Sequence, residues 1–151
     1  MKPGKLRLAA WTALTAVLFF SAAAADLGLR SRSALLEARK QELWRDTPRL
    51  KELHYNGLFE KKLLLLKENA GRLTPEEMER RESLLKAERD LYISGSSAKL
   101  AYTWYKTAAG EFASPLNPWA AEAGKNLEAA RDAWRSELAA AGPDAPPGPT
   151  D

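Results

Sequence analysis

The feature that most constrains this chain is an uncharged apolar stretch that directly follows a positively charged start. Lys2, Lys5 and Arg7 precede Leu8 to Ala25, which are 18 residues without a charge. This order is typical of a secretory signal peptide, and 18 residues are also about the minimum for a membrane-spanning helix. The positive start predicts that the N-terminus stays in the cytoplasm. We therefore expect an exported body, periplasmic, in the bacterial cell envelope or secreted, or anchored as a single-pass membrane protein.

Whether residues 1–25 are a signal peptide or a signal anchor stays open. The alanines at 22–25 offer the small residues that a signal peptidase requires before Asp26. Trp11 near one end of the stretch, with Arg30 and Arg32 beyond the other, would instead suit an uncleaved anchor seated at both membrane surfaces. A buried helix of a cytosolic protein fits less well, because the stretch is apolar on every face and carries a cationic tip.

The body of the chain is neutral, and this excludes several classes of function. The sequence holds 23 Lys and Arg against 20 Asp and Glu, and the three excess basic residues all precede Asp26, the first acidic residue. Residues 26–151 thus lack the one-signed charge that nucleic-acid binding requires, so we expect no nucleic-acid partner. The absence of cysteine excludes disulfides, thiolate metal sites and a lipid-modified N-terminal cysteine.

Residues 26–141 predict one all-α domain of four to five short amphipathic helices, arranged in regular antiparallel hairpins or in an irregular bundle. Val and Ile are scarce, and no period-two alternation indicates a strand. The apolar side of the first helix is expected to include Leu36, Leu43 and Trp44. A disordered Pro-rich tail is expected over 142–151. The predicted helices cover 33–46, 48–70 with a C-terminal cap at Gly71, 75–94 with an N-cap at Thr74 and an end near Gly95, 98–112, and 118–141 with an N-cap at Asn117 and an end at Gly142.

One stretch resembles a known family. Tyr102, Tyr105, Ala108 and Phe112 repeat at helical spacing, and a proline-bearing turn and a helix with Ala123, Leu127 and Ala130 follow. This aromatic–alanine–aromatic rhythm is similar to tetratricopeptide-type (TPR-like) helical hairpins, over residues 98–139 only and without the full 34-residue repeat. The resemblance implies a protein-binding scaffold rather than an enzyme.

No catalytic, metal or cofactor site is expected. His54 is the only histidine, and it shares a stripe with Leu50, Leu58 and Leu65, so we expect it to be a partly buried structural residue. Glu76 and its neighbouring acids suit the start of a helix, where they complement the helix dipole. The run of leucines at 63–66 cannot all face one core. Most are expected to be core residues, and any that stay exposed would form a contact surface.

The concentration of aromatic residues after position 100 is the one feature that suggests a function. Tyr102, Trp104 and Tyr105 span most of the circumference of a helix, so at least one should face outward, and Trp119 follows at the next helix start. Tyr and Trp are enriched at binding hot spots, so these four residues are the candidate protein-interaction site. We expect a non-enzymatic scaffold or protein-binding role. The alternatives are a membrane-anchored spacer or stalk and, third, an enzyme with an unrecognised site.

Overall fold

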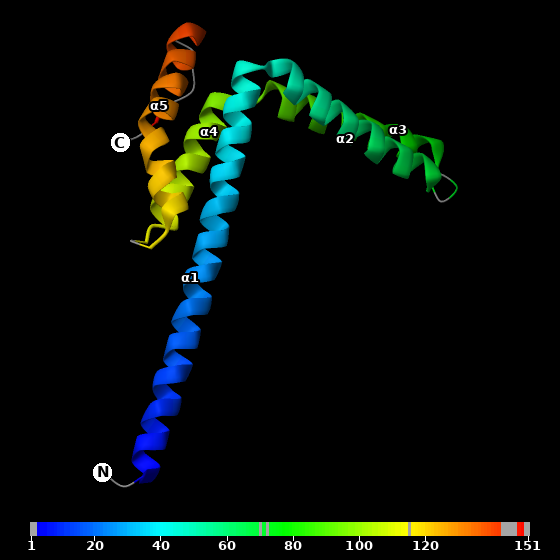
Figure 1. Cartoon of the computed structure of the whole chain (residues 1–151). Coiled ribbons are helices and arrows are strands. Elements are labelled where there is room, and N and C mark those ends of the chain that lie inside the picture. The colour runs from blue at the N-terminus through cyan, green and yellow to red at the C-terminus, as the bar shows by residue number, and fades with distance from the viewer. Residues whose placement is uncertain (1–2, 70, 72, 115, 143–147, 150–151) are drawn as a thin grey trace. The chain divides into compact units, whose positions relative to one another are not determined.

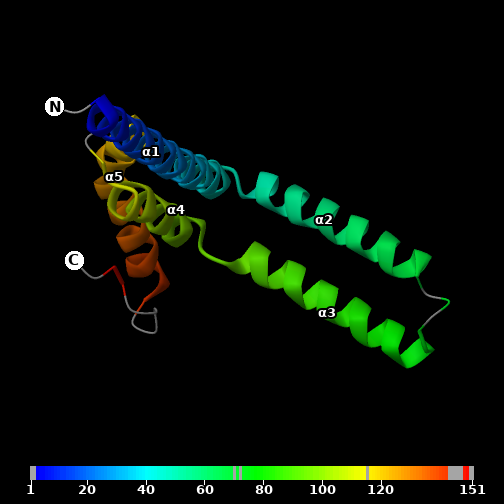
Figure 2. The same cartoon turned by 90° about the horizontal axis from the view of Figure 1, so that it is seen from below.

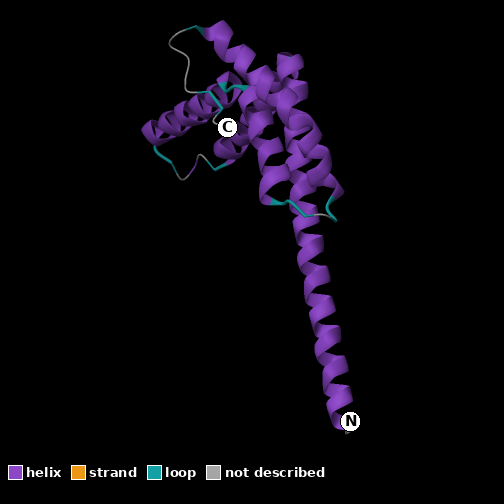
Figure 3. Ribbon diagram, turned by 90° about the vertical axis from the view of Figure 1, so that its left-hand side faces the viewer, coloured by secondary structure: helices purple, strands orange, loops and turns teal. Residues whose placement is uncertain are grey.

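All of the regular structure in the described part of the chain is helical. The computed structural model describes residues 3–69, 71, 73–114, 116–142 and 148–149, and these contain helices and loops but no strand (Figures 1 and 3). The all-α prediction is therefore confirmed. The expected disorder of the tail falls mainly on 143–147 and 150–151, which lie outside the described residues. The elements are α1 (Pro3–Asp46), α2 (Pro48–Glu68), α3 (Pro75–Ser94), α4 (Ser97–Lys106), the π-helical turn η2 (Thr107–Glu111) and α5 (Pro118–Ala141).

The apolar N-terminal stretch and the first helix predicted for the body form one continuous helix, α1. No proline interrupts the sequence between Pro3 and Asp46. The side chains of Asp26 and Arg30 form an ion pair of 2.8 Å directly after the apolar stretch, and this i,i+4 spacing supports a helix. The boundary expected after residue 25 is therefore not marked by a break in secondary structure.

The chain divides into two compact units. Unit 1 contains residues 1–39 and 98–151, and unit 2 contains residues 40–97. Each unit is built around a helical hairpin, α4–α5 in unit 1 and α2–α3 in unit 2. The body expected to form one domain thus contains two packing units, and α1 contributes residues to both.

The core of unit 1 is built from small and aromatic residues. Alanines allow the helix backbones to approach closely, and the aromatic rings fill the remaining space. The Ser31 hydroxyl donates a hydrogen bond of 3.2 Å to the Ala108 carbonyl in η2, which joins α1 to the π-helical turn. The buried cluster consists of Ala34, Leu35, Ala38, Ala98, Tyr102, Tyr105, Ala108, Ala123, Ala130 and Trp134.

The buried side of α1 differs from the predicted one. Leu36 and Leu43 are exposed, whereas Leu35 and its alanine neighbours are buried, and Trp44 alone of the expected residues is buried. The prediction chose the largest apolar side chains. The structure instead buries the face that lets the helices pack closely.

Unit 2 is a pair of antiparallel helices joined at 69–74 (Figure 2). The predicted start of α3 is confirmed, because Thr74 and Glu77 form a reciprocal capping box, and Gly95 is the C-cap. Helix α2 ends earlier than predicted, with Asn69 as its C-cap instead of Gly71. Between the helices, the Tyr55 and Tyr92 rings stack with centroids 5.1 Å apart.

Asn117 fixes the start of α5, as predicted. Its side-chain oxygen accepts hydrogen bonds from the backbone N–H groups of Trp119 (3.1 Å) and Ala120 (3.4 Å). Its amide nitrogen donates to the Phe112 carbonyl at 2.9 Å. At the other end, Gly142 has a φ of +85°, a backbone conformation that favours glycine.

Replacing Asn117 by alanine should destabilise unit 1 by about 2 kcal/mol, at the upper end for an N-cap, because the part-buried Phe112 carbonyl also loses its donor. Thr74→Ala is the comparison, since Thr74 caps an exposed helix start and should cost only about 1 kcal/mol. Urea unfolding of the two variants in detergent measures both values. Equal losses would show that the bond to Phe112 contributes nothing.

Candidate interaction surfaces

The N-terminal part of α1 is the first candidate site, because its large apolar side chains are exposed wherever the structure describes them. The exposed fractions of its large apolar side chains run from 49% at Leu14 to 71% at Leu8. In the part of the chain that the structure describes, one helix is long and apolar enough to cross a membrane, and it contains this segment. Figure 1 shows the segment extending beyond α4 and α5 of the same unit. Water is an unfavourable solvent for such a surface, whereas lipid satisfies it on every side.

The four aromatic residues expected at an interaction site do not form one surface. Tyr102 and Tyr105 lie in the core of unit 1, and the Tyr102 ring packs against Trp134 with centroids 5.5 Å apart. Trp104 and Trp119 are 36% and 39% exposed. Only these two tryptophans can contact a partner directly in this conformation.

The two exposed tryptophans line different hollows beside α1. Trp104 lies in a shallow groove of about 490 Å³ together with Leu29, Ser33 and Phe112. Trp119 lies beside Gly28 in a smaller hollow, and the Arg32 guanidinium is 5.7 Å from the centre of its ring. This distance is within the range of a cation–π contact. The two side chains therefore belong to separate surfaces.

The α2–α3 hairpin carries a larger apolar surface that the sequence analysis assigned mostly to the core. No residue of α3 is buried, and Lys51 is the only buried residue of α2. In the run of leucines at 63–66, Leu64 and Leu65 are exposed, whereas Leu63 and Leu66 are half-buried. The expectation that most of this run is core is wrong, and the contact-surface alternative describes its exposed members.

Leu65 and Leu84 lie on opposite walls of one open groove between α2 and α3, with a volume of about 560 Å³. The floor is apolar, formed by Leu66 and Leu85. The groove is crossed by the Lys62–Glu88 ion pair, in which the amine lies 2.8 and 2.9 Å from the two carboxylate oxygens. This pair ties the two helices together.

Helical periodicity extends this apolar surface along the hairpin. Leu58 precedes Leu65 by seven residues, and Leu91 follows Leu84 by seven residues. Side chains seven apart differ by only about 20° around a helix, so all four leucines lie on the same side of the hairpin. Their exposed fractions run from 41% to 70%. We call Leu58, Leu65, Leu84 and Leu91 the leucine face.

The histidine and the acidic residues are the side chains to test for a metal site. His54 is exposed, not partly buried as expected, and its ring lies 5.1 Å from the Trp44 ring and 5.2 Å from the Tyr55 ring. Within the described ranges, no group of three or more His, Asp or Glu residues is arranged to hold a metal ion.

No protein-family model, curated protein or solved structure matches this chain.

Proposed function

We propose that this protein is a non-enzymatic, membrane-anchored interaction protein of the bacterial cell envelope. In this proposal residues 8–25 of α1 span the membrane with the N-terminus in the cytoplasm. The leucine face of the α2–α3 hairpin binds a helix of a partner protein. The observation that carries the proposal is the leucine face itself, four large apolar side chains in heptad spacing that the chain leaves exposed.

The anchored form is supported by the continuity of α1. The peptide bond between Ala25 and Asp26 lies within an unbroken helix, whereas proteolysis concentrates at exposed loops. The same helix carries Ser31, Leu35 and Ala38 into the core of unit 1, so a retained α1 joins the membrane segment rigidly to that unit. Lys2, Lys5 and Arg7 favour the cytoplasmic side for the start of the chain.

A helix is the partner structure that the leucine face fits best. Two antiparallel helices with leucines seven residues apart present two rows of side chains with a groove between them. A third amphipathic helix can place its own apolar residues between such rows, as in a coiled coil. Exposed charges beside the groove, such as Arg81, would then select the orientation of the bound helix. The scaffold role implied by the tetratricopeptide resemblance agrees with this proposal.

A photo-crosslinking amino acid placed at Leu84 should form adducts with a partner in intact cells, because Leu84 faces the proposed binding groove. Glu82 is the matched control, since it is exposed on the same helix but points about 160° away. Leu65 tests the opposite wall of the groove. The measurement is immunoblotting of the crosslinked chain followed by mass spectrometry of the adducts.

Adducts at Leu65 and Leu84 but not at Glu82 are the expected result. An adduct of twice the mass of the chain would identify the partner as a second copy. If Leu84 and Glu82 gave the same pattern, or neither gave an adduct, the leucine face would not be the binding surface.

A further inference from the structure

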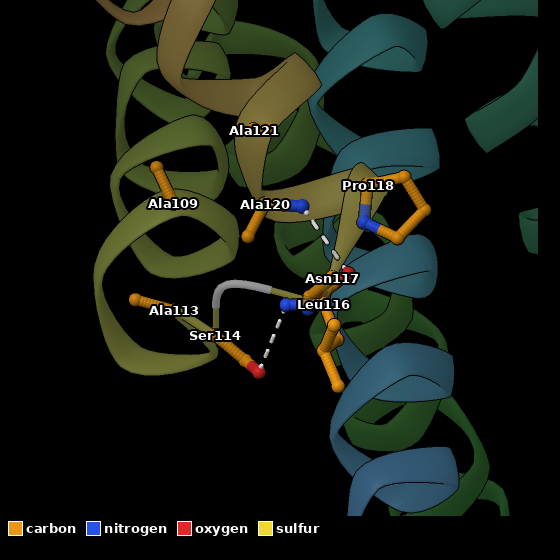
Figure 4. A pocket seen from close by; sticks show the side chains of 8 residues that line it. All are labelled: Ala109, Ala113, Ser114, Leu116, Asn117, Pro118, Ala120 and Ala121. Atoms are coloured by element: carbon orange, nitrogen blue, oxygen red, sulfur yellow. Dashed lines mark hydrogen bonds between the residues drawn. The ribbon is translucent and has the colours of Figure 1, made fainter.

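The turn between η2 and α5 lies against α1 at the point where the apolar segment ends. Ala24 and Gly28 of α1 line one hollow of about 80 Å³ together with Leu116 and Trp119 from the turn and the start of α5. Figure 4 shows this turn from close by, with the Leu116 side chain beside the α1 ribbon. A membrane that contains residues 8–25 would therefore have its surface at the level of this turn.

Leu116 is the most exposed of the large apolar residues that the structure describes, at 87%. Its backbone takes part in a hydrogen-bonded turn, because the Leu116 N–H donates to the Ser114 hydroxyl at 3.4 Å and the Asn117 N–H donates to the Ser114 carbonyl at 2.9 Å. The Leu116 side chain is thus exposed to solvent although it belongs to a hydrogen-bonded turn. The described residues from Phe112 to Asn117 carry no charge, so nothing in them opposes contact with lipid.

The surroundings of Leu116 have the composition of a membrane–water interface. Trp119 is partly exposed, and tryptophan is enriched at the level of lipid headgroups. Arg32 lies over its ring, and Arg30, whose side chain is 63% exposed, pairs with Asp26 one helical turn earlier. Both arginines have side chains long enough to reach lipid phosphates from a position just outside the hydrocarbon region.

The spacing of the tryptophans along α1 fits the thickness of a bilayer. Trp11 lies near the start of the apolar segment, and Trp119 contacts the hollow beside Gly28. Gly28 is the seventeenth residue after Trp11, which corresponds to about 26 Å along a helix. The hydrocarbon core of a bilayer is about 30 Å thick, so the two rings would lie near opposite membrane surfaces.

We propose that the described part of this turn, residues 112–114 and 116–117, is a second membrane contact. Leu116 inserts into the outer surface of the same bilayer that holds α1, Trp119 lies at headgroup level, and Arg30 and Arg32 bind lipid phosphates. The inference rests on the proposed membrane anchor. It adds that unit 1 lies directly on the lipid surface and is fixed in orientation by two contacts instead of one.

The test uses the full chain reconstituted in lipid nanodiscs of phosphatidylcholine and phosphatidylglycerol, one chain per disc. Because the natural chain has no cysteine, single variants can each carry one nitroxide spin label. Leu116→Cys reports on the turn and Val17→Cys on the anchor. Ser136 is exposed and lies about 27 Å from the start of α5, so Ser136→Cys is the control that should stay in water. The readout is the collision rate of each label with oxygen, which is enriched in lipid, and with a water-soluble nickel complex.

The label at position 116 should lie about 5–10 Å below the headgroup boundary, with more oxygen and less nickel contact than the label at 136. If the label at 116 had the same collision rates as the label at 136 while the label at 17 was in lipid, the membrane anchor would stand and the second contact would be overturned. Low collision rates with both reagents at 116 would also overturn it, because they indicate contact with protein. A water-accessible label at 17 would overturn the anchor and this inference together.

Discussion

Replacing both Leu14 and Leu18 by arginine should release the protein from the membrane. Both side chains are exposed in the middle of the apolar segment of α1, so the substitutions remove no packing within the protein. Each arginine near the centre of a spanning helix costs about 2.5–3.5 kcal/mol on insertion scales. Two of them shift the insertion equilibrium by more than about a thousandfold, since each 1.4 kcal/mol is a factor of ten. The measurement is the share of the chain that stays with membranes after an alkaline carbonate wash.

Ser33→Arg is the control for this pair. Ser33 is exposed on the same helix but lies beyond the apolar segment, so its charge stays in water and the variant should remain in the membrane fraction. Retention of the Leu14→Arg, Leu18→Arg chain at the level of the natural protein would rule out residues 8–25 as the anchor.

Tyr105→Ala should have the largest effect on the stability of unit 1. Tyr105 is only 1% exposed and is the largest fully buried side chain among the described residues. Truncating a buried aromatic residue to alanine costs about 3–5 kcal/mol through lost burial and the cavity that remains. Hydrogen exchange measured by mass spectrometry should accelerate about a hundredfold or more in α4 and α5. The α2–α3 hairpin belongs to the other unit and provides the internal reference.

Two further variants test whether the loss of stability comes from the buried Tyr105 ring. Tyr105→Phe keeps the ring and removes only the hydroxyl, so it should cost no more than about 1.5 kcal/mol. Trp104→Ala removes a partly exposed ring from the same helix and should leave exchange in α5 nearly unchanged. If Trp104→Ala and Tyr105→Ala accelerated exchange equally, the core would not be centred on Tyr105.

The sequence predicted well the helix starts, which depend on residues that are close together in the sequence. Thr74 and Asn117 bind backbone groups two or three residues away, so the caps and the helix starts could be read locally. The burial of Leu35 instead of Leu36 depends on which helices approach α1. That choice requires knowledge of the tertiary structure.

The exposure of the leucine face also depends on tertiary structure and could not be predicted from the sequence. An apolar stripe containing Leu58 and Leu65 indicates a helix that buries one side, so the sequence predicts a core on that side. In unit 2, however, α2 packs along its length against α3 and meets the end of α1 near Trp44, so much of the stripe stays exposed. Similarly, the spacing of Tyr102, Trp104 and Tyr105 predicts that at least one of the three rings faces outward, but it does not say which ring. The number of neighbours of a helix is not encoded in its own periodicity.

The division of the chain also sets an order of events during synthesis. Unit 1 is discontinuous in sequence, because residues 40–97 separate its two parts. The α2–α3 hairpin needs only its own adjacent segments and can close as soon as it emerges. Leu35, in contrast, must wait for Trp134, its partner in the buried cluster. At bacterial or eukaryotic elongation rates this delay is on the order of 5–20 s. During that interval the buried side of α1 is open to chaperones and to wrong partners, and the last helix made is the one that closes it.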